Sequence, residues 1–212
     1  MLAYNGFMQP IILASASFYK KMLLDRLGIP FTCCAPDIDE SPKSAESGAV
    51  LAQRLAEEKA HHIAQQFPQA IVIGADQVAV LNGQILGKPG NHQCAVAQLS
   101  AQSGRTVLFY TAISLARFTQ GKLEYQSQVN STEVTFRQLS QKQINHYLEI
   151  EQPYDCAGSF KSEAMGISLF SAINSNDPSA LIGLPLIDLC SMLVEWDVDI
   201  LDKSLNDSAV RH

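Results

Sequence analysis

The segment AIVIGADQVAVL at residues 70–81 decides the fold, because it is a largely apolar run bounded by turn signals. Its length and composition predict a buried strand. The run is interrupted at residues 74–77, where Asp76 and Gln77 are polar and Gly74 would let backbone or ligand approach closely. The dipeptide Asn82-Gly83 follows at once and is a strong signal for a two-residue hairpin.

Helices and strands are expected on both sides of this segment. Before it, the sequence predicts a strand at 9–14, a helix at 18–27 capped by Ser17, a short strand at 31–35, an irregular polar loop at 36–47 and a helix at 49–66. After it, we expect a helix at 91–104, two long strands at 106–118 and 122–139, a helix at 140–149 opened by a capping box at Ser140–Gln143, late strands at 157–160 and 167–173, and a helix from Pro185 to Trp196.

This order of elements indicates an α/β or mixed α+β protein with a large mixed sheet. The 212 residues, of which 47% are hydrophobic, suffice for one large domain or two small ones and need no disulfide staples. We treat residues 1–212 as a single domain, for which two lobes around a central cleft are one possible form. The polar tail at 197–212 is expected to be frayed.

The charge balance limits the classes of partner. With 15 Lys and Arg against 21 Asp and Glu, the net charge is −6. Extended nucleic acid is therefore not an expected partner, because its binding needs a basic face. No apolar run approaches the ~20 residues that span a bilayer. Five cysteines without a C-x-x-C pair are typical of reduced thiols. We expect a cytoplasmic protein without a membrane partner.

One candidate phosphate site follows the first strand. A strand that leads into a helix N-terminus points free N–H groups and a positive dipole end at the turn. Ser15 lies in this turn, and Lys20 and Lys21 lie in the first helical turn. The alternative is a capped helix with solvated lysines, since the Gly-rich pattern of phosphate loops is absent.

Two further lysines are candidates. Lys88 lies between Gly87 and Pro89, on a short stiff loop that could present it to a phosphate as a point charge. Lys59 lies on the helix at 49–66 among charged residues, where surface ion pairs are the alternative reading.

Carboxylates supply candidates for a metal or a catalytic base. Asp76 lies in an apolar strand, where it could bind a divalent cation or activate a water; the alternative is a residue that caps a turn. The loop with Asp37, Asp39 and Glu40 could fold over Asp76 and form a pair of carboxylates for Mg²⁺ or Mn²⁺. A solvated acidic loop is the alternative.

The run CAGSFKSE at residues 156–163 ends at Glu163, near a strand edge. A carboxylate at this place could accept the N1–H and N2–H₂ donors of a guanine base, or it could lie in a solvated loop. Cys156 has no histidine partner in sequence, and we interpret it as a packing thiol rather than a nucleophile.

Taken together and in order, these motifs resemble the Maf family over residues 11–196. The segments that carry the resemblance are LASAS at 13–17, DESP at 39–42, RLAEEKA at 54–60, GADQV at 74–78, GKP at 87–89, SGR at 103–105, YT at 110–111, CAGSFKSE at 156–163 and GLPL at 183–186. The resemblance implies an elongated mixed sheet flanked by helices, similar to the inosine-triphosphatase fold. It also implies a metal-dependent hydrolase that cuts a nucleoside triphosphate between the α- and β-phosphates.

Within the family, DQV at 76–78 and the CAGSFKSE run are similar to the 7-methyl-GTP branch, whereas the dTTP/UTP branch typically has DTV and DKAGGY. The resemblance makes Asp76 the proton acceptor. It assigns base selectivity to Tyr19, Gln77 and Glu163, and phosphate or metal roles to Ser15, Lys20, Lys21, Glu40, Lys59 and Lys88. In this reading Lys59 and Lys88 assist catalysis, and Glu40 with Asp76 holds Mg²⁺ or Mn²⁺.

The chain departs from the family pattern in the first loop, where Phe18 replaces the usual proline and Lys20-Lys21 replaces two arginines. The expected function is hydrolysis of 7-methyl-GTP to 7-methyl-GMP and pyrophosphate, which prevents incorporation of modified nucleotides. Two alternatives remain: a dTTP/UTP pyrophosphatase, and a nucleotide-binding regulator of septum formation without turnover. The resemblance also suggests a homodimer.

Overall fold

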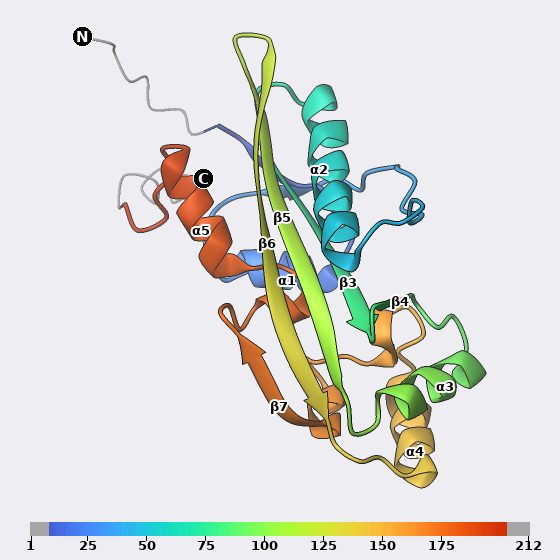
Figure 1. Ribbon diagram of the computed structural model, residues 1–212. Helices are drawn as coiled ribbons and strands as arrows, with labels where there is room; N and C mark the ends of the chain where they lie inside the picture. The colour runs from blue at the N-terminus through green and yellow to red at the C-terminus, as the bar shows by residue number, and fades with distance from the viewer. Residues whose placement is uncertain (1–8, 203–212) are drawn as a thin grey trace.

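The computed structural model describes residues 9–202 and contains one mixed seven-stranded sheet with helices on both faces (Figure 1). The expected α/β class with a large mixed sheet is confirmed. The elements are β1 (Ile11–Leu13), α1 (Phe18–Asp25), β2 (Thr32–Cys33), α2 (Gly48–Gln66), β3 (Ile71–Leu81), β4 (Gln84–Leu86), α3 (His92–Gln102), β5 (Thr106–Thr119), β6 (Lys122–Phe136), α4 (Gln141–Glu151), η1 (Ala157–Ser159), η2 (Met165–Leu169), β7 (Phe170–Ser175), η3 (Ala180–Ile182) and α5 (Leu186–Glu195).

The strand order is β2-β1-β3-β5-β6-β7, and β4 also pairs with β3. The β1 strand is parallel to both of its neighbours, whereas β3, β5, β6 and β7 pair in antiparallel fashion. Asn82 and Gly83 form the predicted hairpin between β3 and β4, both with positive φ.

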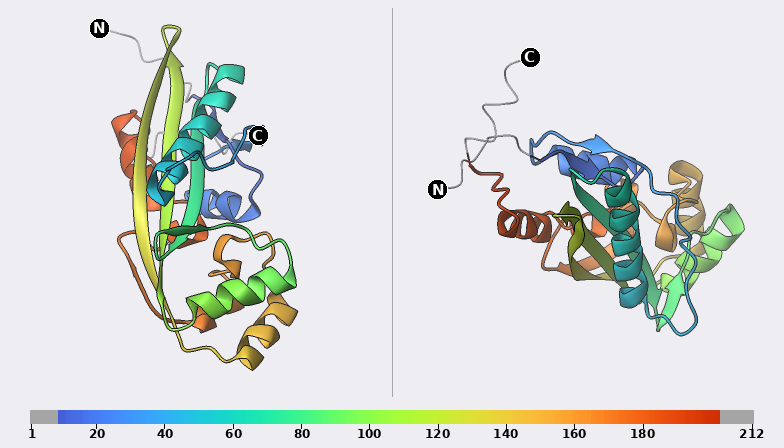
Figure 2. Two further views of the ribbon diagram at one scale, coloured as in Figure 1. Left: turned by 45° about the vertical axis from the view of Figure 1, so that its right-hand side comes forward. Right: turned by 90° about the horizontal axis from the view of Figure 1, so that it is seen from above.

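Helices cover the two faces of the sheet differently (Figures 1 and 2). One face is covered by α2, which packs on β3, β5 and β6. The opposite face packs against α1 and α5 in a core that includes Leu23, Leu193 and Ile73. At the far end of the long strands, α3 and α4 share a separate core with Phe109 and Phe136.

The contact between α2 and β3 is unusually close because Gly74 has no side chain. A Cβ at this position would lie 2.2 Å from the carbonyl oxygen of Ala56 and 2.8 Å from the backbone nitrogen of Ala60. Ala52, Ala56, Ala60 and Ala64 are all fully buried and form one stripe along α2. Backbone therefore packs on backbone, and the helix lies directly on the strand.

The predicted interruption of the central strand is wrong. β3 runs without a break from Ile71 to Leu81, because β5 pairs with it in register from Val72 to Val80. Asp76 and Gln77 lie opposite Ala112 and Thr111 in this ladder. Their polarity reflects what their side chains contact rather than an end of the strand.

Two other predictions require correction near the C-terminus. The expected strand at 157–160 is replaced by the short η1 helix at Ala157–Ser159, because Gly158 and Ser159 both adopt positive φ. The expected strand at 167–173 begins only at Phe170, after η2.

The remaining helix ends agree closely with expectation, and Pro185 caps α5 rather than opening it. Residues 197–202 are not frayed, since Val198 is buried against the α5 core; residues 203–212 lie outside the described part of the chain. No helix within residues 9–202 combines the length and apolar character needed to cross a bilayer.

We expect Gly74→Ala to lower the free energy of unfolding by about 1–3 kcal/mol, because the added methyl group overlaps backbone atoms that cannot turn aside. Gly87→Ala is the matched control, since a Cβ there meets nothing within 4 Å. Denaturant titrations of both variants test this. Equal stabilities for the two would contradict the close approach.

Candidate active site

A cleft of about 750 Å³ opens beside the middle of β3. The β1 strand pairs with β3 only as far as Ile73, and β4 pairs with it only from Ala79 onward. Residues 74–78 therefore have a strand partner, β5, on one edge only. Through this gap, side chains from both faces of β3 reach the same cleft.

Nine of the ten candidate side chains line the cleft: Ser15, Tyr19, Lys20, Glu40, Lys59, Asp76, Gln77, Lys88 and Glu163. Lys21 does not line it, which corrects the expectation that both lysines of the first helical turn face a phosphate. The Lys21 ammonium is exposed and forms an i,i+4 ion pair with Asp25 at 2.8 Å.

An ion triad lies at the α2 side of the cleft. The Lys59 Nζ atom is 2.6 Å from Asp76 Oδ1 and 2.7 Å from Glu40 Oε1. Lys59 and Asp76 are each 8% exposed, so the pair is buried. The surface ion-pair reading of Lys59 is therefore wrong, and so is the reading of Asp76 as a turn cap. The acidic loop does fold toward Asp76, and Glu40 is the residue of this loop that joins the triad.

Contacts within the triad shift the pKa values of Lys59 and Glu40. Burial alone would lower the pKa of Lys59, but the charges and hydrogen bonds of Asp76 and Glu40 outweigh it, so this pKa is raised. Partial burial would raise the pKa of Glu40, yet contact with Lys59 brings it below its ordinary value. At neutral pH the site therefore carries both a positive charge on Lys59 and a negative charge on Glu40.

Lys20 belongs to the same cluster and also lines the cleft. Its side chain passes Gly183, where a Cβ would lie 3.7–3.8 Å from Lys20 atoms. Burial lowers the pKa of Lys20; the carboxylates of Asp76 and Glu40 act against this, and the charges of Lys59 and Lys88 add to it. With three lysines and two carboxylates, the cluster has an excess of positive charge that suits a polyanion.

The turn before α1 adds backbone donors. Ser17 caps the helix, and its own N–H donates to Ser15 Oγ at 3.0 Å. The first turn of α1 therefore faces the cleft with its positive dipole end.

Aromatic and acidic groups lie at the other end of the cleft. Burial and the charge of Glu163 raise the pKa of Tyr19, which places the phenol near that carboxylate. Phe18 is 70% exposed at the cleft edge and meets Tyr19 edge-on, with ring centroids 5.7 Å apart. Burial raises the pKa of Cys156 to about 12, so at neutral pH it is a thiol, which supports its reading as a packing residue.

Sequence reasoning missed the residues that hold the Glu163 loop. Gln102 Nε2 donates to the Gly158 carbonyl at 2.9 Å, and Ser159 Oγ donates to Gln98 Oε1 at 2.5 Å. The backbone N–H of Lys161 donates to the Tyr147 hydroxyl at 3.1 Å. Gln98 and Gln102 are spaced i,i+4 on α3, and this polar pair facing inward was the signal that could have found them.

The donor set at the triad fits a hard divalent cation. Asp76 and Glu40 each use one carboxylate oxygen on Lys59, and no hydrogen bond to the other oxygen occurs within residues 9–202. Mg²⁺ is typically held by one or two carboxylates together with substrate phosphates. In the same range no cluster of three or more His, Cys, Asp or Glu residues forms a complete metal cage. A role for Mg²⁺ or Mn²⁺ stays a prediction.

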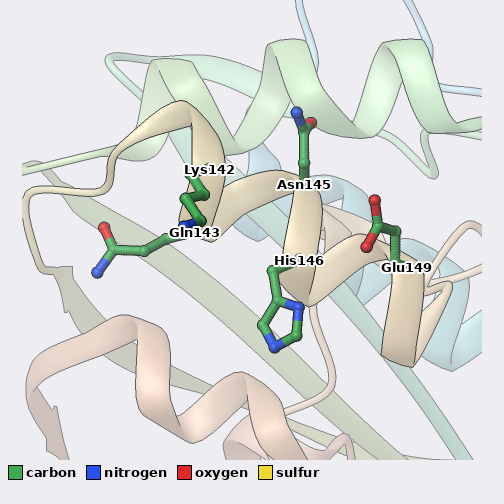
Figure 3. A pocket seen from close by; sticks show the side chains of 5 residues that line it. All are labelled: Lys142, Gln143, Asn145, His146 and Glu149. Atoms are coloured by element: carbon green, nitrogen blue, oxygen red, sulfur yellow. The ribbon is translucent and has the colours of Figure 1, made fainter.

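A second hollow of about 740 Å³ lies along α4 and is lined by Lys142, Gln143, Asn145, His146 and Glu149 (Figure 3). All five side chains come from one helix, and four of them are exposed. It lacks the buried charges of the cleft beside β3, which is therefore the candidate active site.

Several known proteins are similar to this chain. A Staphylococcus aureus structure described as the Ham1 protein covers 89% of this chain and 99% of its own at 15% identity, with a TM-score of 0.46, too low to carry an argument. Proteins named 7-methyl-GTP pyrophosphatase are 50% identical to this chain in Polaromonas sp. (87% of this chain, 84% of the relative), Nitrosococcus oceani (90% and 95%) and Idiomarina loihiensis (92% and 98%). The model of the family described as Maf-like protein matches residues 10–196. The chain belongs to the Maf family.

Proposed function

We propose that this protein hydrolyses 7-methyl-GTP to 7-methyl-GMP and pyrophosphate, with a divalent cation, and so keeps a modified nucleotide out of nucleic acid. The observation that carries the proposal is the buried Lys59–Asp76 pair, joined by the exposed Glu40 and lying beside two more lysines. The names of relatives at 50% identity support the choice of substrate.

The triphosphate binds at the lysine side of the cleft. Lys20 and Lys88 offer point charges to phosphate oxygens, and the first turn of α1 offers backbone N–H groups. Lys21 takes no part, because its ammonium is directed to Asp25.

Asp76 and Glu40 would hold the cation, and their ion pairs with Lys59 keep both carboxylates in place. When bound, the cation supplies charge neutralisation on the phosphate oxygens. The Lys59 side chain, itself 10% exposed, contacts both carboxylates at the wall of the cleft.

In the hydrolytic step, Asp76 accepts a proton from a water as that water attacks the α-phosphorus. The bond between the α-phosphorus and the bridging oxygen breaks, and pyrophosphate leaves with the bonding electrons. Lys20 and Lys88 stabilise the negative charge that moves onto the leaving group. Catalysis is thus mainly positioning and charge neutralisation.

The base binds between Tyr19 and Glu163. The 7-methylguanine ring carries a delocalised positive charge, and attraction to the Tyr19 face is worth about 0.5–2 kcal/mol. Glu163 accepts the N–H donors of the Watson–Crick edge through charge-assisted hydrogen bonds. Uracil and thymine have no ring charge and only one N–H donor on this edge, which favours 7-methyl-GTP over the dTTP/UTP alternative.

We expect Asp76→Asn to lower kcat by about 10²–10⁴-fold, because the amide cannot accept the proton. The matched control is Asp37→Asn, an exposed position in the acidic loop outside the cleft. Release of pyrophosphate from 7-methyl-GTP with Mg²⁺ or Mn²⁺ is the measurement. Full turnover by Asp76→Asn would contradict the mechanism, and binding without any turnover by the wild type would favour the regulator.

The lowered pKa of Lys20 predicts a pH dependence. A lysine with a lowered pKa loses its charge at a lower pH than an ordinary lysine, so kcat/KM should fall as pH rises toward that range. In Lys20→Arg the guanidinium stays charged, and the fall should move to higher pH. If the two pH profiles coincide, Lys20 is not the titrating group.

Glu163→Gln should reduce kcat/KM for 7-methyl-GTP by roughly 10–100-fold relative to UTP, because one charge-assisted acceptor is lost. Glu149→Gln, on the exposed face of α4, is the control. A panel of canonical and methylated triphosphates measures both. An unchanged ranking in Glu163→Gln would favour the pyrimidine alternative.

A further inference from the structure

Hydrogen bonds on the side away from the cleft fix the orientation of the Gln77 side chain. Its Nε2 atom lies 3.0 Å from three acceptors: Thr111 Oγ1, the Ala180 carbonyl oxygen and the Leu181 carbonyl oxygen. Backbone carbonyls can only accept hydrogen bonds, so the amide nitrogen must face them. The amide oxygen is consequently the atom left for the cleft.

Thr111 completes this arrangement. It is fully buried and lies directly opposite Gln77 in the β3–β5 ladder. Its hydroxyl donates to the Ala180 carbonyl at 3.0 Å, so the hydroxyl oxygen accepts one hydrogen from Gln77. The other Nε2 hydrogen goes to the carbonyls of η3, and the amide has no donor left for a ligand.

The η3 carbonyls are themselves held in place by a buried network. Asp177 is 1% exposed and accepts from the backbone N–H groups of Ser179 and Ile187 at 2.8 and 2.7 Å. Ser179 Oγ donates to Asp177 Oδ1 at 2.5 Å and accepts from the Leu186 N–H at 2.9 Å. The η3 carbonyls that accept from Gln77 are therefore held in place by residues on both sides of η3.

We infer that Thr111 is a positioning residue that makes Gln77 an acceptor-only group, so that the cleft selects a base with a free exocyclic amino group. The inference rests on the proposed function and specifies how the same site reads its base. Glu163 can take two N–H donors of guanine, and the second hydrogen of the amino group then matches Gln77 Oε1. A base that presents a carbonyl or a C–H at this place leaves that oxygen without a partner.

Removal of the Thr111 hydroxyl should relax this selection. In Thr111→Val one Nε2 hydrogen loses its buried partner, and the amide can then turn that hydrogen to the cleft. Gln77 would offer a donor as well as an acceptor. Thr111→Ser keeps the hydroxyl and should keep the selection.

The test compares two probes that differ only in the amino group, the α,β-methylene analogues of 7-methyl-GTP and 7-methyl-ITP. Calorimetry gives the ratio of their dissociation constants with Mg²⁺ and without turnover. We expect Thr111→Val to lower the wild-type preference for the amino-bearing probe roughly three- to tenfold, and Gln77→Met to do the same, since about one hydrogen bond is lost. Thr111→Ser should stay within about twofold of the wild type.

A merely structural role of Thr111 would weaken both probes equally and leave the ratio unchanged, which would overturn the inference. Hydrogen exchange offers a second measurement on the wild type. The side-chain NH₂ of Gln77, assigned by its loss in Gln77→Met, should exchange at least roughly tenfold more slowly than that of the exposed Gln128. Equal exchange rates would overturn the inference even if Thr111→Val does not fold.

The outcome separates this inference from the proposed function. If the wild type fails to cleave 7-methyl-GTP but the probe ratio responds to Thr111→Val, the proposed activity is wrong and the positioning role stands. If the wild type cleaves 7-methyl-GTP and the ratio does not respond, the positioning role is wrong and the activity stands.

Discussion

The close approach of α2 to β3 at Gly74 is the constraint on which the site depends. A Cβ at Gly74 would lie 2.2 Å from a backbone oxygen of the helix, so only glycine permits this distance. Lys59 follows Ala56 by one helical turn, and Asp76 follows Gly74 on the same face of the strand. The backbone spacing therefore brings the Lys59 ammonium to 2.6 Å from the Asp76 carboxylate. If α2 lay farther from β3, the charges of Lys59 and Asp76 would be separated. Each would then be a buried charge without a partner, which is strongly destabilising.

The gap between β1 and β4 lets side chains from both faces of β3 serve one cleft. Successive side chains on a strand point to opposite faces, so Asp76 meets α2 while Gln77 meets η3. In a fully paired sheet these side chains would lie in separate layers. Because residues 74–78 lack a partner on one edge, both reach one cleft. One strand thus carries the proposed proton acceptor and a base-reading group at adjacent positions.

Local sequence predicted most elements because helix caps and turns act within a few residues. The prediction that polar residues interrupt β3 is wrong, because β3 is held by pairing with β5. This pairing is a long-range contact that no local pattern contains. Local sequence also grouped Lys21 with Lys20, although neighbouring residues on a helix point about 100° apart. Within α2, the ion pair with Glu58 belongs to Arg54 instead of Lys59. The Gln77–Thr111 pairing depends on the register of two strands, which the sequence does not reveal.

An acidic chain can bind a polyanion because the relevant charges are local. The net charge of −6 acts over a surface that water and salt screen. Inside the cleft, burial lowers the pKa of Lys20, and the neighbouring charges of Lys59 and Lys88 lower it further. In the cluster of three lysines, the positive charge is therefore only partly neutralised by Glu40 and Asp76. A triphosphate supplies negative charge, so its binding relieves the repulsion between the lysines of the free site. A neutral nucleoside supplies no such charge and should therefore bind more weakly than the triphosphate.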